Sequence, residues 1–507
     1  LGWYRGLTVI RPLWMITVFY FEGGKIMKKI FNNELNLEMK GEIVHLYGWV
    51  QKNRNLGGLV FIDLRDRSGI VQLVVRPESE FYTEAESLKS EYVIEVIGKV
   101  VERESKNSNL LTGDIEVEVE KLVVLNKSLD LPFTIDDNTT ALEETRLKYR
   151  YLDIRRNEIK DKLILRNNVM MACREYLSKL GFIEIETPVL CKSTPEGARD
   201  FLVPSRQNKG KFYALPQSPQ LFKQLLMVGG IERYYQFSKC FRDEDLRADR
   251  QPEFTQRDMD LSFVSEDDIM TINEGLIAHI FKKVKDIDIK LPLMRMKYDD
   301  AIRNYGSDKP DLRFGMKIRE ITDLFKNSNF ELFKNSEIVN CLVVKESAPK
   351  YSRKSLDELS NFVKKYGLGG LAYLKIGNEI TGSIAKVLSD EEKNILKEEL
   401  KLENDDLVLF GCGAYNKVKQ ALGALRSKLG KDLNLYKDSD YSLLWVVDFP
   451  SFEYSEEENR YVSCHHPFTM PKDEDVDKLL TDKANCYSKA YDMVINGYEA
   501  GGGSIRI

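Results

Sequence analysis

The sequence predicts an α+β protein of several domains, in which a small barrel of short strands precedes a larger region built on antiparallel strands. Three observations lead to this fold class. The chain has 507 residues, which is enough for two or three domains with sizeable cores. Short runs rich in β-branched residues recur between residues 41 and 125. Farther along, segments that alternate at period two lie among others with helical spacing, which indicates a mixed architecture.

The composition is that of an ordinary globular protein, with 43% hydrophobic and 31% charged residues. The formal net charge is −5, so binding of a nucleic acid must rely on local basic patches. The seven cysteines form no C-x-x-C pair, which favours reduced thiols and a cytoplasmic location.

The first and last residues suggest that the chain is a fragment at both ends. Position 1 is Leu, and we expect translation to begin at Met27, with residues 1–26 as a non-native upstream segment. The apolar run 13–21 is too short for a membrane span and no small-residue cleavage site follows it, so we expect no membrane partner. A signal peptide is the alternative. At the other end, residues 504–507 stop within an alternating strand.

Residues 27–128 form the first predicted domain, and residues 129–160 form a hinge. The expected strands of the domain are 43–47, 48–50, 60–64, 71–75, 93–101 and 115–125, a spacing typical of a small closed barrel. Such a barrel can present an aromatic ring for base stacking beside arginines and amides for base edges. The hinge contains TRLKYRYLDIRR at 145–156, and two interpretations stay open: contact with an RNA backbone, or packing between domains.

The most informative segment is FRDEDLRADRQPEFTQRDMDLSF, at 241–263, which carries dense charge of both signs between two alternating runs. The pattern predicts an antiparallel hairpin with a polar loop at 246–251. The second strand should place Gln256, Asp258, Asp260 and Ser262 on one face, and Thr255, Met259, Leu261 and Phe263 on the other. A solvated surface hairpin is the alternative interpretation.

Several of these segments resemble the class II aminoacyl-tRNA synthetases. Arg242-Asp-Glu244, a loop, and then PEFTQ from residue 252 resemble motif 2 of that class, and RDEDLRADRQPEFTQ resembles the bacterial-type aspartyl-tRNA synthetases. Leu165, Val169, Cys173, Tyr176, Leu177 and Leu180 recur at helical spacing before the expected strand FIEIETP. This unit resembles motif 1, which implies a homodimer, although an ordinary amphipathic helix has the same spacing. The resemblance implies a catalytic domain built on an antiparallel sheet.

The segment GWVQKNRNLGGLVFIDLRDRSGIVQLVV resembles the OB-fold anticodon domain of the same family and implies tRNA(Asp) as a partner. Phe61 matches the position that stacks the middle anticodon base, although a core aromatic residue is the alternative. Arg54, Gln72, Asn107 and Glu116 match positions that read anticodon edges.

The resemblance also implies a pocket for L-aspartate. STPEGARDFLVPSR, from residue 193, resembles a loop that closes on the amino acid, and Glu196 and Asp258 would meet the substrate ammonium group. Gln220 and Lys223 share one face of an expected helix with Gln224, and a solvated polar face is the alternative. His465 borders the pocket. Arg506 would bind the substrate carboxylate through two parallel hydrogen bonds.

ATP and Mg²⁺ are the expected cofactors. The resemblance gives Arg242 the α-phosphate and implies ATP contacts for Glu244, Gln251 and Glu499. Asp492 and Glu499 are isolated carboxylates in an apolar strand region, and a magnesium ion that carries ATP phosphates is a natural partner for them. The run Cys464-His-His466 does not predict a metal site, because adjacent side chains on a strand point to opposite faces.

The remaining expected domains are 161–287 and 426–507, the two parts of the catalytic domain, and 288–425, a bacterial-type α+β insertion with nothing catalytic in it. The resemblance predicts an aspartate–tRNA ligase. Motif 3, which holds ATP in this class, is expected beyond the end of the chain, so we expect the second part to be incomplete and the chain itself to be inactive. The alternatives are a lysyl- or asparaginyl-tRNA synthetase, and a non-catalytic RNA-binding relative.

Overall fold

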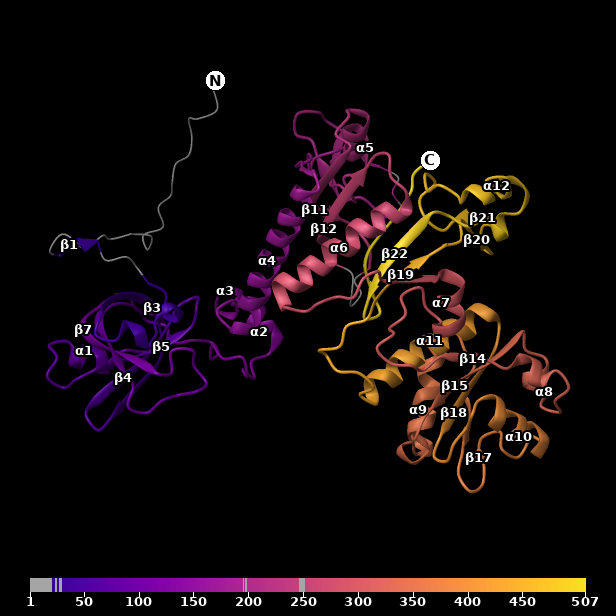
Figure 1. The fold of residues 1–507 in the computed structure, drawn as a ribbon, viewed down its shortest axis with the longest axis horizontal. Helices are drawn as coiled ribbons and strands as arrows, with labels where there is room; N and C mark the ends of the chain where they lie inside the picture. Colours follow the sequence, from indigo (N-terminus) through magenta and orange to yellow (C-terminus); the bar gives the residue numbers. More distant parts are fainter. Residues whose placement is uncertain (1–20, 23–24, 27–29, 195, 197, 246–250) are drawn as a thin grey trace. The chain divides into compact units, whose positions relative to one another are not determined.

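The computed structural model describes residues 21–22, 25–26, 30–194, 196, 198–245 and 251–507 (Figure 1). Met27 and residues 246–250 of the expected loop lie outside this part. The chain divides into two compact units, Leu1–Arg166 and Asn167–Ile507, and each is described by itself. A short antiparallel pair, β1 (Phe21–Glu22) and β2 (Lys25–Ile26), precedes the first domain.

The first unit contains a closed five-stranded barrel with the strand order β3-β4-β5-β7-β6. The strands are β3 (Ile43–Leu56), β4 (Leu59–Arg65), β5 (Ile70–Val75), β6 (Val93–Glu102) and β7 (Ile115–Asn126), with α1 (Tyr82–Glu86) between β5 and β6. Alternate residues of each strand fill one apolar core, for example Leu46, Ile62 and Leu73. The predicted barrel is therefore confirmed, with the first two expected strands joined into β3.

The second unit contains the predicted hairpin in a three-stranded sheet of order β12-β11-β8. These strands are β8 (Ile183–Glu184), β11 (Arg233–Phe241) and β12 (Glu253–Leu261). The register pairs Gln236 with Asp258 and Tyr234 with Asp260, so the polar face is as expected. Phe263 is different: it follows the strand with φ 59° and is 95% exposed, so its predicted place on the apolar face is wrong.

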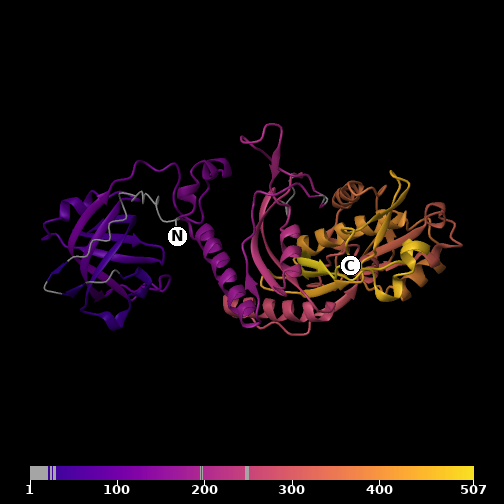
Figure 2. The same cartoon turned by 90° about the horizontal axis from the view of Figure 1, so that it is seen from above.

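A second sheet has the order β13-β19-β22-β23. It consists of β13 (Met294–Lys297), β19 (Leu443–Val447), β22 (Ala490–Ile495) and β23 (Tyr498–Ser504). Helix α6 (Glu266–Lys285) packs on both sheets, because Leu276 shares a core with Tyr235 of β11, whereas Met270 shares one with Trp445 of β19. Figure 2 shows α6 along one side of these strands. A single helix thus holds the two sheets together.

Other elements of this unit are α5 (Gln220–Val228), β9 (Leu202–Pro204), β10 (Phe212–Ala214), α7 (Tyr298–Tyr305), β20 (Phe452–Ser455), β21 (Arg460–Ser463) and α12 (Lys478–Thr481). The long helix α4 (Asn157–Lys179) runs from the end of the first unit into the second. Its Val169, Cys173 and Leu177 pack in a core as expected, whereas Leu165 is exposed, so the predicted apolar face begins one turn later.

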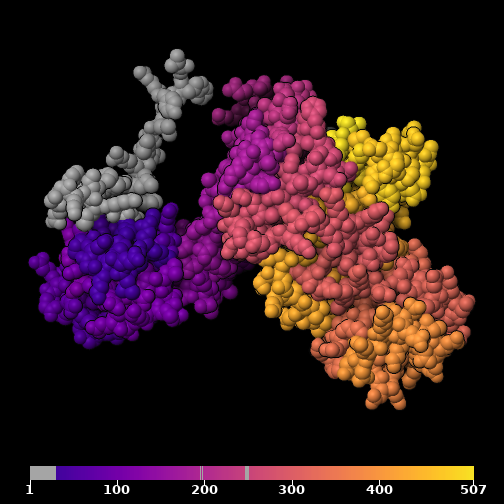
Figure 3. Space-filling model, viewed as in Figure 1, coloured from indigo at the N-terminus to yellow at the C-terminus, as the bar shows by residue number. Residues whose placement is uncertain are grey.

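The insertion is a five-stranded sheet of order β14-β15-β18-β16-β17, which forms its own lobe (Figure 3). Its elements are β14 (Ile318–Glu320), α8 (Glu331–Lys334), β15 (Ile338–Val344), α9 (Arg353–Lys364), β16 (Ala372–Lys375), β17 (Thr381–Gly382), α10 (Asp390–Glu399), β18 (Leu407–Gly413) and α11 (Tyr415–Asp432). Alternate residues of β15 and β18 face two separate cores. The expected limit at 425 falls inside α11, and β13 belongs to the other sheet, so we propose that the insertion begins after α7 and ends after α11.

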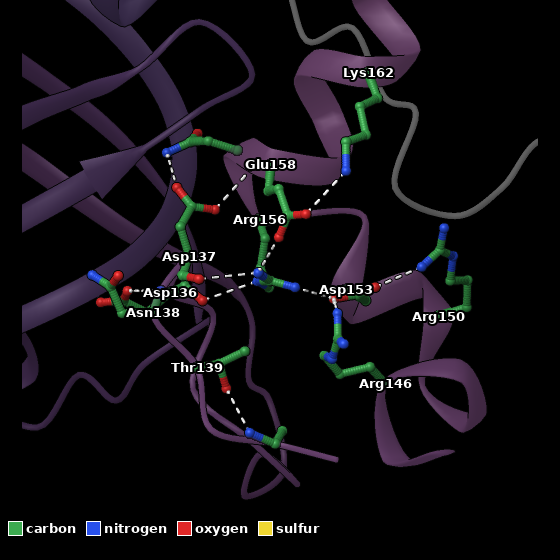
Figure 4. A network of polar contacts seen from close by, with 12 residues as sticks. Asp136, Asp137, Asn138, Thr139, Arg146, Arg150, Asp153, Arg156, Glu158 and Lys162 are labelled. Carbon is green, nitrogen blue, oxygen red and sulfur yellow. Dashed lines mark hydrogen bonds and ion pairs between the residues drawn. The ribbon is translucent and has the colours of Figure 1, made fainter. Parts of the chain in front are cut away.

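The hinge is organised by one buried carboxylate, Asp153, which lies in α3 (Arg150–Asp153) after α2 (Glu143–Lys148). Arg156 Nη1 donates to Asp153 Oδ1 over 2.9 Å, and Arg150 donates to the other oxygen over 2.6 Å (Figure 4). Arg156 also donates to the carbonyl oxygens of Asp136 and Asp137. These contacts hold the segments of the hinge together within the first unit, and both interpretations of the hinge stay open.

A second set of contacts joins the hinge to the barrel. Arg155 pairs with Glu91, and its guanidinium lies 5.1 Å from the ring centroid of Trp49. Glu91 is buried and also accepts two hydrogen bonds of 2.7 Å from Arg65 of β4. Because a buried carboxylate with two arginine partners is well compensated, the last part of the hinge is fixed to the barrel.

Candidate functional site

A buried ion pair lies at the centre of the candidate site. Lys223 of α5 donates from Nζ to Asp258 Oδ1 of β12 over 2.9 Å, and the two side chains are only 7% and 5% exposed. The helical spacing predicted one polar face for α5, and the structure buries the lysine of that face. Buried charges require a partner. The Oδ2 atom of Asp258 has no hydrogen-bond partner within the described residues, so this carboxylate keeps an acceptor for a ligand.

Behind the ion pair lies a chain of neutral hydrogen bonds on the same face of β11. Tyr234 Oη donates to Gln236 Oε1 over 2.8 Å, and Thr187 Oγ1 donates to the same oxygen over 3.0 Å. Tyr234 is fully buried, and burial raises its pKa strongly, with Asp258 and Asp260 adding to the rise. The phenol therefore stays neutral and serves as a hydrogen-bond donor.

Asp260 and Arg506 bring the two sheets to one site. Burial raises the pKa of Asp260, whereas the positive charges of Lys223 and Arg506 oppose the rise. Burial lowers the pKa of Arg506, and the charges of Asp260 and Asp258 counteract this shift. Two cations and two carboxylates from β12, α5 and the end of the chain thus interact, although Lys223 and Arg506 are 283 residues apart in the sequence.

The two histidines after β21 lie in different environments. Arg506 Nη1 donates to the ring of His466 and to Ser504 Oγ, the latter over 2.7 Å. The His466 ring stacks on Phe468 with centroids 3.8 Å apart. Burial lowers the pKa of His466 to about 4, and Arg506 contributes to this decrease, so the ring is neutral at pH 7. Burial also lowers the pKa of His465, whose Nε2 is buried and has no hydrogen-bond partner within the described residues.

Glu196 lies in the expected loop and is held by two hydroxyl groups. Its Oε2 accepts from Ser218 Oγ over 2.6 Å, and its Oε1 accepts from Thr194 Oγ1 over 2.9 Å. Ser218 precedes α5, whose first residue is Gln220. Glu196 is therefore positioned by the turn that begins the helix of Lys223.

Arg242, Glu244 and Gln251, three of the expected ATP residues, lie at the two ends of the hairpin loop. The guanidinium of Arg242 lies 5.1 Å from the ring centroid of Phe254, and its backbone N–H donates to the Pro252 carbonyl over 2.9 Å. Glu244 and Gln251 are both exposed, one before and one after residues 246–250. Stacking on Phe254 leaves the planar donors of Arg242 directed away from the ring and available to an anion.

Asp492 and Glu499 converge over a glycine. Asp492 pairs with Gly502 across β22 and β23, and a Cβ on Gly502 would lie 2.1 Å from Asp492 Oδ1 and 3.5 Å from Glu499 Oε1. Only glycine leaves room for both carboxylates here. Burial raises the pKa of Asp492 to about 8, and the charges of Glu499 and Asp308 add to the rise. Two carboxylates above an open backbone suit a magnesium ion that takes its other ligands from phosphate and water.

One face of the barrel collects most of the expected anticodon residues. Arg54 pairs with Phe61 across β3 and β4, and it donates to Asp63 Oδ1 over 2.7 Å. Gln72 lies opposite Asp63 and donates to Glu116 Oε2 over 2.7 Å. Phe61 is partly exposed, so it is not a closed core residue. The ring and the polar groups therefore share one surface, as stacking and edge recognition require.

Asn107 lies elsewhere, in the turn between β6 and β7. Its side-chain oxygen accepts from the Asn109 N–H over 3.0 Å, and its backbone N–H donates to the Gly113 carbonyl over 3.0 Å. A Cβ on Gly113 would lie 1.8 Å from the Asn107 carbonyl oxygen. The contacts of Asn107 thus stabilise a turn and do not join it to the face of Phe61.

Comparisons with known proteins decide the family. One family model, described as class II tRNA synthetases (D, K and N), matches residues 142–507, and another, described as an OB-fold nucleic acid binding domain, matches residues 44–125. An aspartate–tRNA ligase of Streptococcus agalactiae is 52% identical over 484 residues, which are 95% of this chain and 83% of that protein. The chain belongs to the aspartate–tRNA ligase family. An aspartate–tRNA(Asp/Asn) ligase of a Geobacillus species is 53% identical and covers 94% of this chain and 81% of its own length.

Solved structures agree with this family assignment at the level of the fold. A putative aspartyl-tRNA synthetase from Leishmania major matches with a TM-score of 0.55 and 17% identity, over 96% of this chain and 83% of that one. The aspartyl-tRNA synthetase from Entamoeba histolytica matches with a TM-score of 0.54 and 18% identity, over 95% and 79%. The barrel is the OB-fold domain of an aspartate–tRNA ligase, and the second unit carries the class II catalytic domain.

Within the described residues, no group of three or more His, Cys, Asp and Glu side chains could hold a metal ion by itself. No helix of that part of the chain is long and apolar enough to cross a membrane. All seven cysteines of this aspartate–tRNA ligase family member are free thiols.

Three features of the site were not predicted from the sequence. The Tyr234–Gln236 hydrogen bond was overlooked, although period-two alternation places both residues on the face of Asp258. The contact of His466 with Arg506 joins two segments that have no common motif. Lys309 lies 3.5 Å from Glu499, from a region for which no catalytic role was expected.

Proposed function

We propose that the chain binds L-aspartate and ATP, forms aspartyl-adenylate, and transfers the aspartyl group to the 3′ end of tRNA(Asp). The observation that carries this proposal is the buried pair of Lys223 and Asp258 within the electrostatic reach of Arg506. A pocket with two cations and two carboxylates of β12 suits a ligand that has two carboxylates and one ammonium group.

In this proposal, Lys223 and Arg506 bind the two carboxylates of the substrate, and Asp258 and Glu196 bind its ammonium group. Gln220 and His465 complete the pocket. Asparagine would leave one of the two buried cations without a negative partner. Because an unpaired buried charge is costly, the site selects aspartate over its amide.

The nucleotide would lie between the hairpin and the β22–β23 strands. Arg242 would bind the α-phosphate, while Glu244, Gln251 and Glu499 hold the rest of the nucleotide. Asp492 and Glu499 fit a magnesium ion, which would neutralise phosphate charge when bound. The protein residues mainly position the reactants and neutralise charge, which is how phosphoryl-transfer sites generally act.

The chemistry needs no covalent nucleophile on the protein. A carboxylate oxygen of aspartate attacks the α-phosphorus of ATP, and the bond to the β-phosphate oxygen breaks, so pyrophosphate leaves. A ribose hydroxyl of the tRNA then attacks the aspartyl carbonyl carbon, loses its proton, and AMP leaves. Arg242 stabilises charge on the α-phosphate in both steps.

The anticodon would bind on the face of Phe61, with Arg54, Gln72, Glu116 and Asn107 as the expected reading residues. We infer a homodimer through the region of α4 and β8, and a cytoplasmic location, where tRNA is charged. The printed names of the relatives differ in tRNA range, so whether tRNA(Asn) is also charged is a separate measurement.

The test combines equilibrium binding of the amino acid with ATP–pyrophosphate exchange, using aspartate, asparagine and lysine. We expect binding of aspartate alone among the three. We expect exchange to depend on aspartate in the same way, because the exchange reaction reports formation of aspartyl-adenylate. Binding of lysine or asparagine in place of aspartate would favour another member of the class. Binding of tRNA with none of the three amino acids would favour a non-catalytic RNA-binding protein.

A further inference from the structure

A loop at residues 306–313 reaches the nucleotide half of the proposed site. It follows α7 and precedes the insertion sheet. Lys309 Nζ lies 3.5 Å from Glu499 Oε2, and the two side chains are 33% and 45% exposed. The contact therefore joins residues that are 190 positions apart in the sequence, and Glu499 is one of the two carboxylates proposed for the magnesium ion.

The loop is held in place by the residues that follow Lys309. Leu312 packs against the core formed by β19, β22 and α7. Asp311 lies beside Gly497, in the turn between β22 and β23, where an added Cβ would be 3.1 Å from the Asp311 Cβ. Arg313 binds Asp311 through two oxygens over 2.7 to 3.2 Å. These contacts fix the loop against the hairpin that carries Glu499, so Lys309 is directed there by the fold.

The loop is also fixed from the insertion. Arg426 of α11 is buried and donates to the carbonyl oxygens of Asp311 and Phe314 over 2.8 and 2.9 Å, and to that of Met316. Its guanidinium lies 4.0 Å from the Phe314 ring centroid. The segment after Lys309 is thus anchored from the insertion as well as from the turn between β22 and β23.

The charges around Lys309 explain what the lysine does there. Lys309 Nζ contacts Glu499 Oε2, whereas Glu499 Oε1 lies on the side of Gly502 where Asp492 Oδ1 also lies. A metal ion bound at Oε1 would neutralise the carboxylate and so weaken its attraction for the lysine. An ammonium group released at this place would remain beside the nucleotide phosphates, and lysine binds phosphate as a compact charge with three donors.

We propose that Lys309 is a further nucleotide-binding residue, which pairs with Glu499 before the nucleotide binds and donates to a phosphate oxygen afterwards. This inference rests on the proposed function, because it assumes ATP and a divalent cation at Asp492 and Glu499. It extends that function, because it adds Lys309, from the loop that leads to the insertion, to the nucleotide site.

The test measures binding and does not depend on turnover. Binding of Mn²⁺ alone is followed by electron paramagnetic resonance, and binding of ATP with and without Mg²⁺ by calorimetry. For Lys309→Met we expect tighter Mn²⁺ binding, because Glu499 loses a competitor. We expect ATP to bind about tenfold more weakly or worse, the size of one charge-assisted hydrogen bond. Lys309→Arg should retain most of the ATP affinity.

The matched control is Lys297→Met, which removes a more exposed lysine of β13 that lies 3.8 Å from Asp448. It should change neither affinity. Unchanged aspartate affinity and circular dichroism of Lys309→Met show that the variant is folded. Unchanged ATP affinity in Lys309→Met overturns the proposal, even if Mn²⁺ binds more tightly, because the lysine then only balances charge. If the unmodified chain binds aspartate but no ATP, the nucleotide part of the proposed function falls as well.

Discussion

The side chains of Lys223 and Asp258 have almost no contact with water. Each charged group is therefore stabilised mainly by the other. Replacing Lys223 with Met should lower the free energy of unfolding of the second unit by about 3–5 kcal/mol, because a buried carboxylate loses its partner. Denaturant unfolding followed by circular dichroism measures this. The double variant Lys223→Met with Asp258→Leu should recover part of the loss, and equal destabilisation of the single and double variants would contradict the argument.

Tyr234 and Tyr235 are adjacent tyrosines on opposite faces of β11, which makes them a matched pair. Tyr234→Phe removes the hydrogen bond to Gln236 behind Asp258. We expect weaker aspartate binding with little change in ATP binding, and a cost of about 1 kcal/mol in stability. Tyr235→Phe removes a hydrogen bond of 3.1 Å to Glu184 on the other face and should leave the aspartate affinity unchanged. Calorimetric titration of both variants with aspartate distinguishes them.

The lowered pKa of His466 predicts that the stability of the protein depends on pH. Its pKa is about 4 in the folded protein and 6.5 in the unfolded chain, so the unfolded chain binds more protons between these values. The stability that comes from neutral His466 is therefore present above pH 6.5 and is lost as the pH falls towards 4. Thermal unfolding between pH 4 and 7.5 should show a shallower dependence in His466→Asn than in the unmodified chain. Parallel profiles would assign the dependence to other groups.

At the scale of elements, the hinge helices are held by charged contacts of very different burial. Arg156 is buried and donates hydrogen bonds to Asp153, Glu158 and two carbonyl groups. Lys162, in contrast, forms an exposed ion pair with Glu158 over 2.9 Å. Arg156→Met should cost about 3–5 kcal/mol and make residues 129–156 sensitive to limited proteolysis. Lys162→Met should cost at most about 1 kcal/mol. Equal proteolysis of the two variants would count against the role of Asp153 as the centre of the hinge.

Most elements could be predicted from local patterns, because alternation at period two reports which strand residues share a face. This located the barrel strands and the face of Asp258. It could not report where a strand stops, so Phe263 was misplaced and the expected strand at 182–188 is only Ile183–Glu184. Long-range contacts leave no local signal. Lys309 meets Glu499 only through the packing of the loop on β22 and β23, and that contact was not predictable.

At the scale of the whole molecule, the proposed dimer needs an apolar surface. Met171 of α4 and Ile183 of the edge strand β8 are both large and exposed, and an unpaired strand edge is a ready site for association. The double variant Met171→Asp with Ile183→Asp should shift the protein from dimer to monomer in sedimentation velocity at micromolar concentration. Leu480→Asp, at another exposed leucine in α12, is the control and should remain a dimer. A monomer in the unmodified chain would contradict the inferred homodimer.

The three carbonyl groups that Arg426 binds belong to Asp311, Phe314 and Met316, at the end of the loop that carries Lys309 and just after it. The insertion therefore also supports the catalytic domain, since Arg426 of its helix α11 binds the segment next to the proposed nucleotide site. Removal of this domain would therefore also remove the hydrogen bonds that hold the segment after Lys309. A descendant that lost it would also have to rebuild the nucleotide loop, so the two are expected to be inherited or lost together.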